Sequence, residues 1–95
     1  MTTKKYDTLS ERAGKLCIEY VECARVIEEV TTLMMMHVRV NDDYGSRICS
    51  VRRRKSDILY QLAQLETLAL ETLSNREYAR YFRYVSVMLS PLTEH

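Results

Sequence analysis

The chain has 95 residues, 46% hydrophobic and 28% charged, with a formal net charge of +1. Such a length fits one domain with a small core, and chains of this size gain stability from oligomerisation. The composition is typical of a folded protein rather than a disordered one. The net charge is too small to indicate, by itself, binding to nucleic acid or to a membrane surface.

Residues that interrupt regular structure are scarce, with two glycines and one proline in the whole chain. Sheet proteins need a turn about every 8–12 residues, and turns favour Gly, Pro, Asn and Asp. The sequence therefore predicts an all-α protein. No uncharged apolar run approaches the roughly 20 residues of a bilayer-spanning helix, and the N-terminal segment lacks the apolar stretch of a secretory signal. Three cysteines without metal or redox spacing fit a reducing compartment, so we expect a cytoplasmic protein.

The first predicted helix spans about residues 9–40 and follows a polar tail, residues 1–7. Thr8 and Glu11 match the capping-box pattern that starts helices. Apolar positions then recur at alternating spacings of four and three residues. This heptad seam predicts lengthwise packing of the coiled-coil kind, and it consists of Leu9, Ala13, Leu16, Tyr20, Cys23, Ile27, Val30 and Met34, with His37 at its end.

A turn is predicted at residues 41–46, because NDDYGS contains the side chains that favour chain reversal. A second helix is expected over about residues 47–73, and a short turn makes the two helices an antiparallel hairpin. A turn at this position would place Tyr20 opposite Thr67. The segments HVRV and ICSV also fit a β-hairpin over residues 37–51, which remains the alternative to helix–turn–helix.

Ser74 and Glu77 form a second capping-box pattern and predict a third helix over about residues 75–89, before a C-terminal tail at 91–95. Residues 8–90 are thus expected to form a single helical domain, like a three-helix bundle with a coiled-coil seam. The third helix has half the length of the others and cannot cover two long apolar faces. We therefore expect a homodimer or another protein to cover the remainder.

Three consecutive methionines, Met34 to Met36, sweep about 200° of helix surface and cannot all face one seam. The commoner explanation is a core helix between two neighbours. The functional interpretation is an adaptable contact surface, since thioether side chains repack against varied partners. The candidate apolar partner-binding residues are Val26, Leu33, Met35, Met36 and Val40.

Four consecutive cations, Arg52 to Lys55, span about 300° of a helix. A solvated surface is the simplest explanation, whereas contact with an acidic protein would add Arg52, Arg53 and Arg54 to the partner-binding set. Contact with phosphates is the alternative, although no helix-turn-helix or zinc-finger spacing supports it. The alternative nucleic-acid surface consists of Arg52, Arg53, Arg54, Lys55, Arg76, Arg80, Arg83 and Tyr84.

Catalysis has little support in the sequence. His37 ends the apolar seam, Cys49 has no neighbouring base, and glycine occurs only at positions 14 and 45, which is incompatible with a phosphate-binding glycine loop. We expect no enzymatic activity, cofactor, metal, small-molecule substrate or membrane association.

The sequence thus predicts a helical adaptor or inhibitor that docks on a larger intracellular protein through the apolar residues of 26–40 and the arginine clusters. The alternatives are a small nucleic-acid-binding regulator and a structural subunit of a larger assembly. Small adaptor and inhibitor proteins of phages and mobile elements often have this size and shape, which is an analogy only.

Overall fold

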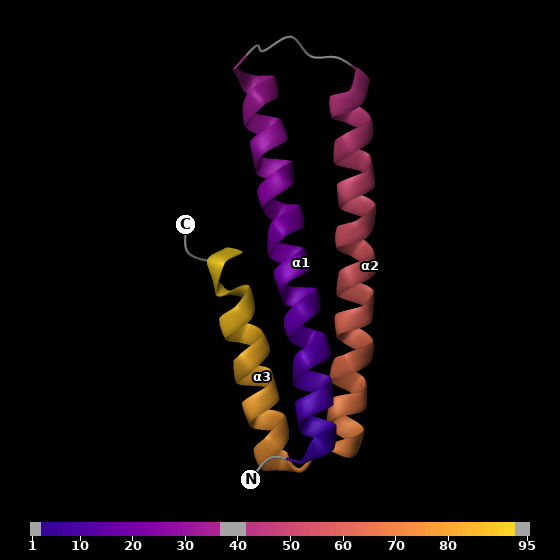
Figure 1. Ribbon diagram of the computed structural model, residues 1–95, viewed down its shortest axis with the longest axis vertical. Coiled ribbons are helices and arrows are strands. Elements are labelled where there is room, and N and C mark those ends of the chain that lie inside the picture. The colour runs from indigo at the N-terminus through magenta and orange to yellow at the C-terminus, as the bar shows by residue number, and fades with distance from the viewer. Residues whose placement is uncertain (1–2, 37–41, 93–95) are drawn as a thin grey trace.

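The computed structural model describes residues 3–36 and 42–92. These ranges form α1 (Lys4–Met35), α2 (Asp42–Thr72), α3 (Asn75–Leu89) and a 3₁₀ turn, η1 (Ser90–Leu92). Figure 1 shows the long α1–α2 hairpin with the shorter α3 beside it. The predicted all-α fold, a helical hairpin plus a third helix, is confirmed.

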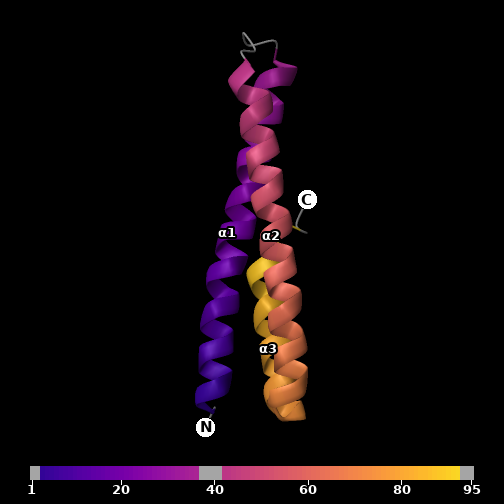
Figure 2. The same ribbon diagram turned by 90° about the vertical axis from the view of Figure 1, so that its right-hand side faces the viewer.

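The helices form a thin, elongated bundle, 54 × 23 × 15 Å along its principal axes. In Figure 1, α1 lies between α2 and α3. It packs extensively against both, whereas the contact between α2 and α3 is smaller. Because α3 runs only along the N-terminal half of α1, the bundle has a three-helix closed half and a two-helix open half (Figures 1 and 2).

The first helix starts at Lys4, so the predicted tail is wrong for residues 4–7. Thr3, not Thr8, caps it, because the Thr3 hydroxyl accepts a hydrogen bond of 3.2 Å from the backbone N–H of Tyr6. Thr8 lies inside the helix and donates to the carbonyl of Lys4 at 3.0 Å. The extra turn is favourable because it brings the Tyr6 side chain against the core.

The second helix starts at Asp42, so the predicted turn is wrong for residues 42–46 and the β-hairpin is wrong for residues 42–51. The residue types of DDYGS fit the start of a helix as well as a turn, because aspartate is favourable in both. Position 41 of the predicted turn and positions 37–40 of the predicted first helix lie outside the described residues.

The earlier start of α2 also changes the helix register. The Lys55 ammonium lies 5.1 Å from the centre of the Tyr20 ring, so Tyr20 faces Lys55 and not Thr67. The adjacent pair agrees, because Arg54 Nε donates to Glu19 Oε2 at 2.6 Å. The connection between the helices lies closer to the N-terminus than NDDYGS suggested, and every facing pair shifts accordingly.

The core lies in the closed half, where all three helices meet. Its buried cluster contains Leu9, Ala13, Leu65, Ala69, Leu73 and Tyr81. Burial also raises the pKa of Tyr81 to about 12, as expected for a phenol whose charged form is disfavoured by desolvation. Cys17 is fully buried although it lies off the heptad seam, because α3 covers the neighbouring face of α1.

A glycine permits the close approach of α3 to α1. A Cβ atom at Gly14 would collide with the Tyr84 hydroxyl and lie 3.3 Å from the adjoining ring carbon. The end of the Tyr84 side chain therefore lies against the α1 backbone, and a larger residue at position 14 would force it to move.

The N-termini of α1 and α3 are joined by the Glu77 carboxylate. Its Oε2 atom accepts hydrogen bonds from the Thr3 backbone N–H at 2.9 Å and the Thr3 hydroxyl at 2.8 Å. The predicted cap at Ser74 is confirmed, since its hydroxyl accepts from the Glu77 N–H at 3.2 Å. The carboxylate thus joins the neighbouring helix to its own cap, since the Ser74 backbone and hydroxyl also hydrogen-bond to it, the hydroxyl at 3.4 Å from Oε1.

These bonds from Thr3 lower the pKa of Glu77 below its ordinary value of 4.5. A carboxyl with a lowered folded-state pKa stabilises the fold above the unfolded pKa, and this contribution is lost as the pH falls through the folded value. We therefore expect the free energy of unfolding of the wild type to fall more steeply below pH 4.5 than that of Glu77→Gln. Urea unfolding followed by circular dichroism at about pH 7 and about pH 3.5 measures the difference. Glu71→Gln, at an exposed carboxylate of α2, is the matched control, and equal slopes for Glu77→Gln and wild type would contradict the role of Glu77.

Candidate docking surface

The open half of the hairpin, residues 26–36 of α1 and 42–52 of α2, lies beyond the reach of α3. The C-terminal end of α3 and η1 stops beside the middle of α1, where Met88 and Pro91 line a hollow together with Val21 and Arg25. Figure 1 shows that the hairpin continues well past this level. Each helix of the open half therefore has a single helical neighbour among the described residues.

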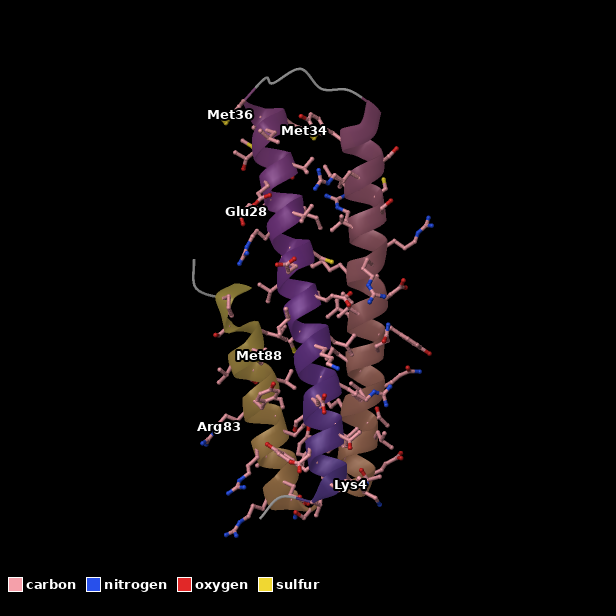
Figure 3. All side chains as sticks on the ribbon, viewed as in Figure 1. Lys4, Glu28, Met34, Met36, Arg83 and Met88 are labelled. Atoms are coloured by element: carbon pink, nitrogen blue, oxygen red, sulfur yellow. The ribbon has the colours of Figure 1, made fainter. Side chains whose placement is uncertain are left out.

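Apolar side chains are exposed at the end of this open half. Leu33 is 38% exposed, Met35 75% and Met36 67%. Figure 3 shows Met34 on the side facing α2 and Met36 on the opposite side, as expected for consecutive helical residues. Three of the predicted apolar partner-binding residues thus lie together at one end of the hairpin.

The other two predicted apolar residues differ from these three. Val26 is half-buried on α1, two turns from Leu33. Val40 lies outside the described residues, as does His37.

The basic run on α2 is divided between two environments. Arg54 pairs with Glu19, and Lys55 lies over the Tyr20 ring, so both contribute to the contact between α2 and α1. Arg52 and Arg53 are exposed, with no described acidic partner. The 100° rotation per residue explains this division of one continuous run.

The arginines of α3 form a separate group. Arg76, Arg80 and Arg83 are all exposed, and Figure 3 shows Arg83 projecting away from α1. Arg76 is next to Glu77, which contacts Thr3, sixteen residues or about 24 Å along α1 from Glu19, the partner of Arg54. Arg83 is next to Tyr84, which contacts Gly14, only five residues or about 8 Å from Glu19. The two groups lie on different helices and come closest at the Arg83 end.

Two aromatic residues of α3 are partly exposed. The end of the Tyr84 side chain contacts α1 at Gly14, while the residue is 37% exposed beside the arginines. Phe82 is 56% exposed. The inner face of α3 is centred on the buried Tyr81, and this rotates Phe82 towards the gap between α2 and α3.

Sequence reasoning missed two apolar hollows in the closed half. One lies between α2 and α3 and is lined mainly by Leu59, Leu62, Phe82, Val85 and Leu89. The other lies where the start of α1 meets the end of α2. We call this second hollow the basic trough, and it is lined by Lys4, Lys5, Thr8, Leu9, Arg12, Leu68 and Thr72. Treating residues 4–7 as a tail concealed the helical spacing that places three of these cations together.

The cysteines show no sign of activation. Cys17 is buried, and burial raises the pKa of its thiol, which disfavours the thiolate nucleophile. Cys23 is half-buried and Cys49 exposed. Over residues 3–36 and 42–92, no three or more His, Cys, Asp and Glu side chains are grouped so that they could hold a metal ion.

Comparison with known proteins returned no matching family model, no matching curated protein and no matching solved structure. Among the described helices, none is both long enough and apolar enough to cross a bilayer.

The different burial of the three cysteines predicts an order of reaction with a thiol reagent. We expect the exposed Cys49 to be labelled first, Cys23 more slowly, and Cys17 only when the protein unfolds. Mass spectrometry of peptides after timed labelling measures this order. Rapid labelling of Cys17 in the native protein would contradict the packing of α3 on α1, and a urea-unfolded sample gives the reference for full reactivity.

Proposed function

We propose that the protein is a non-enzymatic adaptor or inhibitor that docks on a larger intracellular protein through the open half of its hairpin. The observation that supports this most directly is the exposure of Leu33, Met35 and Met36 where α3 gives no cover. Burying one such side chain fully contributes about 1.5–3 kcal/mol. A partner that covers them would therefore gain substantial free energy from a small contact.

The chemistry of the open half also suggests the character of the partner. Unbranched methionine side chains fit apolar grooves of varied shape, as in helix-in-groove recognition. Arg52 and Arg53 lie about 15 Å from the start of α2 and would be attracted to acidic groups around such a groove. The proposed target surface is thus an apolar groove with an acidic border.

We also propose that the protein is a homodimer when it is not bound to its larger partner. A chain of this length gains stability by covering apolar surface between copies. The exposed apolar residues lie in both halves of the bundle, so self-association and docking on a larger protein do not need the same surface.

A nucleic-acid-binding regulator is less well supported. Its candidate arginines lie on two different helices, Arg54 is paired with Glu19, and the end of the Tyr84 side chain contacts α1 at Gly14. A structural subunit of a larger assembly would use the same open half as a docking module, and only the identity of its partner would differ.

Site-specific photo-crosslinking in cells of the native host tests the docking surface. A photoreactive phenylalanine analogue at position 36 lies in the open half, and the same analogue at position 70 replaces an equally exposed apolar residue of the closed half. We expect a discrete adduct with a larger protein from position 36 and none from position 70.

Absence of an adduct at position 36, or the same adduct from both positions, would contradict docking through the open half. An adduct at position 36 with nucleic acid would instead support the regulator. Circular dichroism of both variants checks that the helices are retained.

A further inference from the structure

The basic trough combines an apolar floor with a rim of one charge sign. Leu9 is buried at its base, Leu68 closes it from α2, and the cations Lys4, Lys5 and Arg12 surround it. No acidic residue lines it. Its shape and charge suit a helix with an apolar residue on one face and a carboxylate one helical turn before and one helical turn after that residue.

The C-terminal half of α1 carries such a surface. Glu22, Val26 and Glu29 are spaced four and three residues apart, so they lie on one face of the helix. Both glutamates are exposed and Val26 is only half-buried. We call these three residues the acidic stripe.

The charges of α1 are unevenly distributed along its length. Residues 4–18 contain four cations, Lys4, Lys5, Arg12 and Lys15, and two acidic residues, Asp7 and Glu11. Glu11 pairs with Lys15 at 3.6 Å. Residues 19–35 contain four glutamates, Glu19, Glu22, Glu28 and Glu29, and one cation, Arg25. One helix therefore has a mainly basic start and a mainly acidic end.

We propose that the basic trough of one copy binds the acidic stripe of a second copy, with the two α1 helices antiparallel. This register places Val26 of one copy over Thr8 of the other, Glu22 beside Arg12, and Glu29 beside Lys4. The same register brings Lys15 next to Glu19. A two-fold axis at the level of residue 17 along α1, on the face opposite the buried Cys17, then forms every contact twice, which gives a closed dimer with no unfilled trough.

Charge complementarity favours a second copy over other occupants. The spacing of trough and stripe on one helix allows both to be filled by the same two-fold operation, whereas a parallel pair would place lysine against lysine. The apolar contact is limited to Val26 with Leu9 and Leu68. The dimer should therefore weaken as salt rises, because exposed charges are screened within about 10 Å at 0.1 M ionic strength.

This inference rests on the homodimer of the proposed function and specifies which surfaces form it. The exposed end of the open half is not part of the dimer contact. Leu33, Met35 and Met36 follow Glu29 in the chain, so they would extend past the start of the partner's α1. Docking on a larger protein can therefore fail or succeed independently of this inference.

A pair of charge reversals tests the register. Arg12→Glu places two glutamates together at each contact between positions 12 and 22, and Glu22→Arg places two arginines together there. We expect each variant alone to dimerise about tenfold or more weakly than the wild type, since like charges then meet twice. In a mixed dimer of the two variants, opposite charges meet again at both contacts, so mixing should restore dimerisation.

Sedimentation equilibrium gives the dissociation constants, and energy transfer between differently labelled variants detects the mixed dimer. Arg76→Glu on α3 is the matched control and should dimerise like the wild type. Both reversals change exposed residues, and circular dichroism checks that the helices are kept.

Three results would overturn the inference: a wild-type monomer at all concentrations, variants that dimerise as tightly as the wild type, or a mixture that stays dissociated. The second result would show self-association through another surface, which leaves the proposed function standing. The first would remove the homodimer from it but not the docking of the open half.

Discussion

The unequal lengths of α1 and α3 determine the rest of the structure. The first helix has 32 residues and the third has 15, and α1 is the helix on which both neighbours pack. Because hydrophobic burial is roughly proportional to the apolar area removed from water, the core forms where three helices meet. The same mismatch leaves the far end of the hairpin with a single helix–helix contact and with its methionines exposed.

Two polar contacts complement this packing at the closed end. The Glu77 carboxylate joins the starts of α1 and α3, and the Tyr78 hydroxyl donates to Glu66 of α2 at 3.1 Å. The short α3 is thus tied to both long helices near its N-terminus, while its C-terminal end relies on apolar contact with α1. Gly14 lies between these regions and lets the Tyr84 ring approach the α1 backbone.

Much of the fold could be predicted from the sequence, because heptad spacing and the scarcity of glycine and proline are strong, regular signals. The bounds of α3 are predicted correctly, since Ser74 and Pro91 delimit them locally. The starts of α1 and α2 are not, because threonine and aspartate can either cap a helix or continue it, and the choice depends on distant contacts such as that of Tyr6 with the core. The pairs of residues that face each other on α1 and α2 depend on where the connecting segment lies, so the predicted register was wrong as well.

The candidate site shows the same limit. Exposed methionines and a divided basic run could be expected from the 100° rotation per residue alone. That Arg54 meets Glu19 and that Phe82 faces outward depends on register and on how α3 is rotated, neither of which a single-helix pattern contains. The basic trough depends on two helix ends meeting, so it was not predictable until the start of α1 was known.

The two proposed surfaces differ in their physics, and this bears on how they would work together. Apolar burial dominates at the open end, where only the attraction of Arg52 and Arg53 to an acidic border depends on salt, whereas binding between the trough and the stripe depends mainly on screened charges. In the antiparallel dimer, Met36 lies nineteen residues from the axis at the level of residue 17 in each copy. At 1.5 Å per residue the two tips would be about 57 Å apart, at opposite ends of the assembly. Such a dimer could hold two target sites at once, and linked binding at both would exceed the affinity of either alone. Conditions that dissociate the dimer would then weaken target binding, although the docking residues of the open half are unchanged.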